Sequence, residues 1–89
     1  MKVTINLDNM DPVHKLPGST SAFMFEFLKY ADSEGIITLS PIRKEAVQTK
    51  FGFTHYMTEK ALKQCIQEEV FTKVCRGVYK INPNIFTIE

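Results

Sequence analysis

The sequence predicts an α+β domain with three helices and a small antiparallel sheet that ends in a hairpin. Three signals within residues 51–83 favour this class. They are a glycine turn at Gly52, a helix that begins at the hydroxyl residue Thr54, and two short alternating strands around Arg76-Gly77. This order of turn, helix and hairpin is typical of the second half of a winged helix-turn-helix.

Length and composition predict one small domain in the cytoplasm. The chain has 89 residues, and 44% of them are hydrophobic, which suffices for one core. No run of about 18 apolar residues is present, and the N-terminus is too short and too polar for a signal peptide. Cys65 and Cys75 have no second Cys or His at metal-ligand spacing. We therefore expect two buried or half-buried thiols, no metal and no membrane partner.

The charge distribution supports nucleic-acid binding more than the net charge does. The net charge is only +1, but residues 1–40 carry three Lys and five Asp or Glu, whereas residues 41–89 carry eight Lys or Arg and five Glu. The basic excess therefore falls on the half that contains the turn-helix-hairpin pattern, which is where a basic surface for binding nucleic acid is expected.

The N-terminal segment, residues 1–19, reads as a strand followed by a loop, and residues 20–89 form the predicted winged-helix domain. Residues 2–7 alternate between apolar and polar, which predicts a half-buried strand. This strand needs a partner, either a later strand or the same strand of a second copy. Asp8 to Ser19 contains two turn dipeptides, Asp11-Pro12 and Pro17-Gly18, and is expected to be a loop.

The first two helices of the domain follow this segment. Helix 1 is expected from about Ser19–Ser21 to Ala31 or Ser33, with Phe25 off its apolar face. Phe25 either packs beneath the N-terminal segment or marks a dimer surface. Residues 36–39 predict a strand. Helix 2 is expected over residues 41–50, because Ser40 caps it and Pro41 suits the first helical position. Its core residues are expected to be Ile42, Ala46 and Val47, packing with Phe51.

Helix 3, from Thr54 to about Glu68, is the predicted recognition helix. The expected inward residues are Met57, Thr58, Ala61, Leu62, Cys65 and Ile66. In a helix-turn-helix the second helix reads base edges in the major groove with its N-terminal turns. The predicted contact residues are therefore Thr54, His55, Tyr56, Glu59, Lys60 and Lys63. Alternatively, Tyr56 is a partly buried aromatic, and Glu59 and Lys63 form a solvated i, i+4 pair.

The hairpin is predicted over residues 70–81, with a turn at Cys75-Arg76-Gly77, and an apolar tail follows at 85–88. Its cations Lys73, Arg76 and Lys80 are expected to contact phosphates, although such residues also protect edge strands. Arg43, Lys44 and Lys50 on helix 2 are predicted to add backbone contacts. No nucleophile elbow, phosphate-binding Gly loop or paired catalytic residues are recognisable, so we expect no enzyme and no cofactor.

The stretch Arg76-Gly77-Val78-Tyr79, followed by Asn82-Pro83-Asn84-Ile85-Phe86, resembles the C-terminal part of RepL-type plasmid replication proteins of Gram-positive bacteria. The similarity in layout covers residues 20–86, and only about 75–86 match in detail. The resemblance implies a DNA-binding protein of a plasmid, phage or other mobile element that acts in replication or transcription control. The short chain and its distinct N-terminal strand depart from that family.

Double-stranded DNA is the predicted partner, bound by a homodimer formed through helix 1, the N-terminal strand or the C-terminal tail. Replication or transcription proteins are further candidate partners. Two alternatives to double-stranded DNA binding remain open. In the first, the domain is a protein-interaction module that does not bind DNA. In the second, it binds single-stranded DNA by stacking Tyr56 or Tyr79 on the bases.

Overall fold

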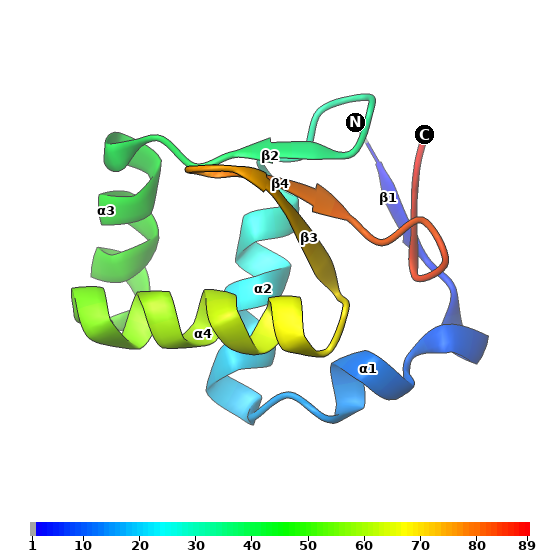
Figure 1. Cartoon of the computed structure of the whole chain (residues 1–89), viewed down its shortest axis with the longest axis horizontal. Helices are drawn as coiled ribbons and strands as arrows, with labels where there is room; N and C mark the ends of the chain where they lie inside the picture. The colour runs from blue at the N-terminus through cyan, green and yellow to red at the C-terminus, as the bar shows by residue number, and fades with distance from the viewer. Residues whose placement is uncertain (1) are drawn as a thin grey trace.

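Two small antiparallel sheets and a group of helices share one core in the computed structural model, which describes residues 2–89 (Figure 1). Met1, the first residue of the predicted N-terminal segment, lies outside the described residues. The elements follow in the order β1 (Val3–Ile5), the 3-10 helix η1 (Leu7–Asn9), α1 (Asp11–His14), α2 (Gly18–Leu28), β2 (Ile36–Thr38), α3 (Pro41–Phe51), α4 (His55–Gln67), β3 (Phe71–Cys75), β4 (Val78–Ile81) and β5 (Phe86–Ile88). The predicted α+β class with a small antiparallel sheet is confirmed.

The larger sheet has the strand order β2-β4-β3, and both pairs are antiparallel. β3 and β4 form the predicted hairpin, and Arg76 and Gly77 make its turn. Gly77 has φ of 75°, in the left-handed region that glycine adopts without strain. The Leu39 backbone N–H donates to the Gly77 carbonyl at 2.7 Å, so the hairpin turn is tied to the link between β2 and α3.

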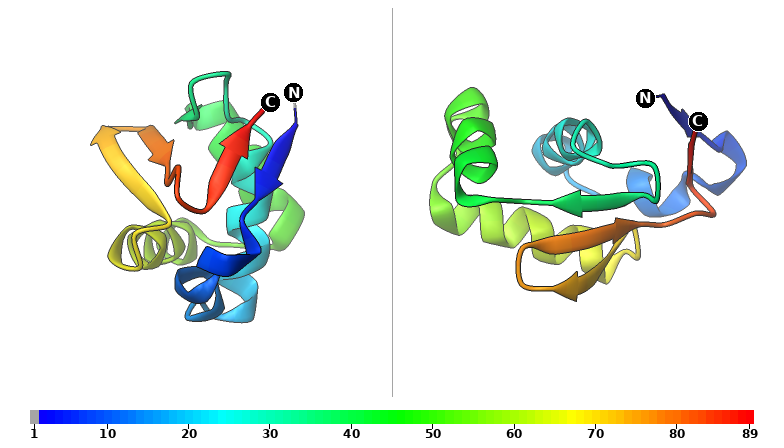
Figure 2. Two further views of the ribbon diagram at one scale, coloured as in Figure 1. Left: turned by 90° about the vertical axis from the view of Figure 1, so that its right-hand side faces the viewer. Right: turned by 90° about the horizontal axis from the view of Figure 1, so that it is seen from above.

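The smaller sheet joins the two ends of the chain, since β1 pairs with β5 (Figure 2). Thr4 lies opposite Thr87, and the backbones of Lys2 and Glu89 exchange two hydrogen bonds. The apolar tail therefore packs back on its own chain, and the N-terminal strand finds its partner there. The N-terminal segment also contributes Val13 and Leu16 to the core.

Helices α3 and α4 begin and end where the sequence predicts. Ser40 and Thr54 are the N-caps, and their hydroxyl oxygens accept hydrogen bonds from the backbones of Arg43 and Met57. Gly52 ends α3 with φ of 67°, which suits glycine because a side chain there would strain the backbone. Only residues 52–54 separate the two helices, so α4 must turn sharply away from α3.

The core lies between α2, α4 and the inner face of the larger sheet. Phe23 and Phe27 on α2 are fully buried, and their ring centroids are 4.1 Å apart. Phe27 also stacks on Phe71 of β3, and Phe23 stacks on Phe53 after the α3–α4 turn. These aromatic contacts fix α2 against the elements that carry the predicted DNA contacts.

Several local predictions are wrong. The predicted loop between Asp8 and Ser19 contains η1 and α1, and α2 begins earlier than expected, at Gly18, and ends earlier, at Leu28. Pro17 precedes α2 without a side-chain cap. The turn dipeptides thus separate short helical turns and do not abolish helical structure, because proline is tolerated in the first turn of a helix.

The predicted burial of helix residues also needs correction. On α3, Val47 is buried, but Ile42 is 81% exposed and Ala46 is exposed as well. On α4, Met57 is also exposed. Cys65 is buried as predicted, whereas Cys75 is exposed, and both are free thiols. Ile42 and Met57 lie in the first turn of their helices and Cys75 lies at the end of β3, whereas Ala46 lies in the middle of α3 on the side that faces away from the core.

Candidate nucleic-acid interface

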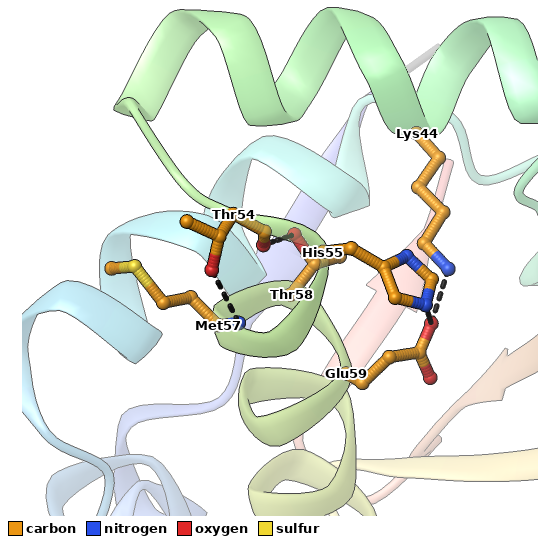
Figure 3. Close-up of polar contacts among 6 residues, drawn as sticks. All are labelled: Lys44, Thr54, His55, Met57, Thr58 and Glu59. Atoms are coloured by element: carbon orange, nitrogen blue, oxygen red, sulfur yellow. Dashed lines mark hydrogen bonds and ion pairs between the residues drawn. The ribbon is translucent and has the colours of Figure 1, made fainter.

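The N-terminal half of α4 carries most of the predicted recognition residues on its exposed side. His55 and Tyr56 are exposed, Tyr56 at 73%, and so are Lys60 and Lys63. The Thr54 hydroxyl is already engaged as the helix cap, and the Thr58 hydroxyl donates to the Thr54 carbonyl at 3.0 Å (Figure 3). Thr54 therefore fixes the start of the helix, and the residues after it form the accessible surface.

Glu59, one turn of α4 after His55, makes the ionic contacts within this surface (Figure 3). Its Oε1 is paired with the Lys44 ammonium of α3, and the His55 Nε2 lies 3.9 Å from the same oxygen. The hydrogen bond from Lys44 lowers the pKa of the Glu59 carboxyl, and the nearby charges of His55 and Lys73 act in the same direction. Glu59 therefore stays ionised at neutral pH, and its ion pair joins Lys44, not Lys63.

The three predicted cations of helix 2 are engaged with other groups of the protein. Lys44 is paired with Glu59, and Lys50 is 3.0 Å from Glu26 on α2. The Arg43 guanidinium donates to the Thr38 carbonyl at 2.9 Å and lies over the Tyr30 ring. These side chains hold α3 to its neighbours, so their charges are less available to a phosphate than the sequence suggests.

The hairpin cations divide between two faces of the sheet. Lys73 lies opposite Tyr79 and shares the face of β3 that carries the buried Phe71, which stacks on Phe27 of α2. Lys73 also lies close enough to Glu59 of α4 for its charge to lower the pKa of that carboxyl. Lys80 lies opposite Thr72 on the other face, where a hollow is lined by Ser33, Glu34 and the C-terminal strand. The structure therefore brings Lys73 toward the α4 surface and places Lys80 away from it. Arg76 is exposed in the turn.

Five exposed cations of α4 and the hairpin have no carboxylate within ion-pair distance among residues 2–89: Lys60, Lys63, Lys73, Arg76 and Lys80. Lys80 lies on the other face of the sheet, so the four cations that remain for the α4 surface are Lys60, Lys63, Lys73 and Arg76. A hollow of about 450 Å³ runs along α4 and brings four predicted residues together, Tyr56, Glu59, Lys60 and Lys63. It also includes Gln64 and Gln67, which the predicted contact set omits. Gln64 and Gln67 follow Lys60 and Lys63 at i+4, and this spacing would have pointed to both.

Exposed apolar side chains lie beside these polar ones. Met57 is exposed next to Tyr56, and both line a groove of about 220 Å³ between α4 and the start of α2. Ile42 projects from the first turn of α3. Sequence reasoning placed Met57 and Ile42 in the core, so it missed them as surface residues.

Tyr79 does not belong to the surface. It is only 6% exposed, and burial raises the pKa of its hydroxyl. Tyr79 therefore has no free ring face on which a base could stack, and only Tyr56 remains for that role.

The described residues contain no cluster of three metal-ligating side chains. Burial raises the pKa of the Cys65 thiol to about 12, so this cysteine is unreactive at neutral pH. None of the helices in residues 2–89 combines the length and apolar character that a membrane-spanning segment needs.

No family model matches the sequence, and comparisons with curated proteins and with solved structures found no match. The resemblance to RepL-type proteins, which lies mainly in residues 75–86, therefore stays a prediction.

Proposed function

We propose that this domain is a winged helix-turn-helix that binds double-stranded DNA. α4 enters the major groove, and the β3–β4 hairpin lies along the backbone as the wing. The order of α2, β2, α3, α4 and the hairpin supports this assignment, as does the strand order β2-β4-β3. The observation that carries the proposal is that Lys60, Lys63, Lys73 and Arg76 on α4 and the hairpin form no ion pair among residues 2–89, because phosphate neutralisation dominates DNA affinity.

Within this proposal the residues take different roles. Lys60, Lys63, Lys73 and Arg76 contact phosphates, whereas His55 and Tyr56 reach base edges from the first turn of α4. Four phosphate contacts correspond to a slope of about −3.6 in log K against log salt concentration. The resemblance of residues 75–86 supports replication or transcription control of a mobile element as the process, with a homodimer as the binding form.

The test is fluorescence anisotropy with a labelled random-sequence duplex and with a single strand of the same length. Affinity for the duplex is expected at about 50 mM salt and should fall steeply by about 200 mM. Arg76→Ala should weaken binding to all duplexes and reduce the slope by about 0.9. The matched control is Lys15→Ala, which removes an exposed cation beside α1 and should leave the slope unchanged.

Other outcomes would contradict the proposal. No affinity for the duplex at low salt, or a flat salt dependence, would remove its basis. Stronger binding to the single strand would favour stacking on Tyr56. Absence of any nucleic-acid affinity would favour the protein-interaction alternative, which the exposed Tyr56 and Met57 beside the groove between α2 and α4 support.

A further inference from the structure

Within the part of the chain that the structure describes, residues 2–89, β1 pairs only with β5, and its outer edge lies at the surface without a partner strand (Figure 2). Lys2 and Glu89 exchange backbone hydrogen bonds, and the Asn6 N–H donates to the Ile85 carbonyl. Because hydrogen-bonding groups alternate along an antiparallel strand, residues 2, 4 and 6 face β5, and Val3 and Ile5 direct their N–H and C=O groups to the outer edge. An unpaired edge of this kind is a template for another strand.

Apolar surface lies directly beside this edge. A groove of about 380 Å³ is lined by Val3 and Ile5 of β1 and by Phe25, Leu28 and Ala31 from α2 and the segment after it, with Lys29 at its rim. Val3 and Ile5 are only partly buried, and Phe25 is 39% exposed. A two-stranded sheet is marginal by itself, so both the strand and the groove would gain from a further strand.

We propose that this edge pairs with β1 of a second copy of the chain, which forms a symmetric dimer with a continuous β5-β1-β1-β5 sheet. Antiparallel pairing of identical strands satisfies a two-fold axis. With the axis at Thr4, Val3 of each copy lies opposite Ile5 of the other, and the two pairs exchange four hydrogen bonds. A register centred on Val3 or Ile5 would leave only one pair of residues within β1 that exchanges backbone hydrogen bonds. The axis at Thr4 is preferred because it gives two such pairs.

The register has further consequences that suit a second copy. Val3 and Ile5 of the second copy extend the apolar face over the groove and cover Phe25. On the other face, Lys2 lies opposite Asn6, so no like charges meet. The contact involves none of the α4 or hairpin residues proposed to bind DNA, so the dimer can be tested without DNA. The interface is small, which places the dimer in the weak range, with a dissociation constant of about 1 μM to 1 mM.

The first test is analytical ultracentrifugation across this range. The mass is expected to rise from 10.2 kDa toward twice that value as concentration increases. Thr4→Lys places two ammonium groups opposite each other at the axis and should raise the dissociation constant about fivefold. Thr87→Lys is the matched control. Thr87 is exposed directly opposite Thr4 on β5, one strand further from the axis, so its substitution should leave the dimer intact.

The second test reads the register. At the axis the two Thr4 Cα atoms should be about 4.5 Å apart, within the range of a disulfide. In a Cys75→Ser background, which removes the exposed thiol, Thr4→Cys should form a covalent dimer with oxidised glutathione. Lys2→Cys should not, because its copies are four residues apart in this register. A chain that stays monomeric, or a dimer insensitive to Thr4→Lys and not cross-linked by Thr4→Cys, would overturn the proposal.

Discussion

Removal of the Glu59 carboxylate should strengthen binding to DNA of any sequence. Lys44 is paired with Glu59, so its charge is neutralised on the surface proposed to meet phosphates. Glu59→Gln keeps the shape of the side chain but releases the Lys44 ammonium for one more phosphate contact. Each such contact contributes about 0.9 to the salt slope, so affinity at about 0.1 M salt should rise about eightfold and the slope should steepen by about 0.9.

The assay is anisotropy with a random-sequence duplex over a salt series. Glu45→Gln is the matched control, because it removes one negative charge from α3 at an exposed residue without an ion pair among residues 2–89. It should change affinity less than about twofold, since exposed charges are screened. In the double variant Lys44→Met with Glu59→Gln, the slope should return to that of the wild type.

Two results would refute this reasoning. Equal effects of Glu59→Gln and Glu45→Gln would indicate a response to net charge alone. A loss of affinity confined to sites with cytosine at one position would instead mean that Glu59 accepts a hydrogen bond from a base, as carboxylates do with the cytosine amino group. Failure of the wild type to bind DNA would count against the proposed function and would say nothing of the Lys44–Glu59 pair.

Three further outcomes are expected. Tyr56→Ala should change which sequences are selected from a random duplex pool and leave the salt slope unaltered, and a uniform loss of affinity would contradict a role in base contact. In urea unfolding, Val47→Ala should cost about 1.5–3 kcal/mol because it empties a site that is 2% exposed, whereas Ile42→Ala on the same helix should cost less than about 0.5 kcal/mol. Hydrogen bonds from Lys29 and Lys50 hold the pKa of Glu26 below its ordinary 4.5, so the ionised Glu26 contributes its full share of the unfolding free energy above that pH. This share is lost as the pH falls through the lowered pKa, because the unfolded chain takes up the proton first. In urea unfolding over a series of acidic pH values, Glu26→Gln should therefore lose less unfolding free energy than the wild type.

Local chemistry made much of the α4 and hairpin region predictable. Capping by Ser40 and Thr54, the left-handed Gly52, and the Gly77 turn each depend on residues within a few positions of one another. The i+3 and i+4 periodicity of α4 likewise identified Ala61, Leu62 and Cys65 as its buried side. Such signals need no knowledge of the fold, because backbone preferences and side-chain spacing act within one or two turns.

The same periodicity could not show how far the core extends. It marks the apolar side of a helix but not whether another element covers that side, so Ile42 and Met57 were assigned to the core although they are exposed. Alternation along β4 predicts that Tyr79 and Lys80 face opposite ways, but only the packing of the sheet against the helices decides that Tyr79 is the buried one.

The sequence by itself determined the order of the elements from α2 to the β3–β4 hairpin, the caps of α3 and α4, the turns at Gly52 and Gly77, and the group of basic residues from which a DNA surface would be drawn. The tertiary structure decided which of those charges remain available. Lys44 and Lys50 are neutralised by Glu59 and Glu26, which lie 15 and 24 residues away in the chain, and β1 finds β5 at the opposite terminus. Contacts at such separations depend on how the helices and sheets pack, because a salt bridge forms only where folding brings the two charges within about 4 Å.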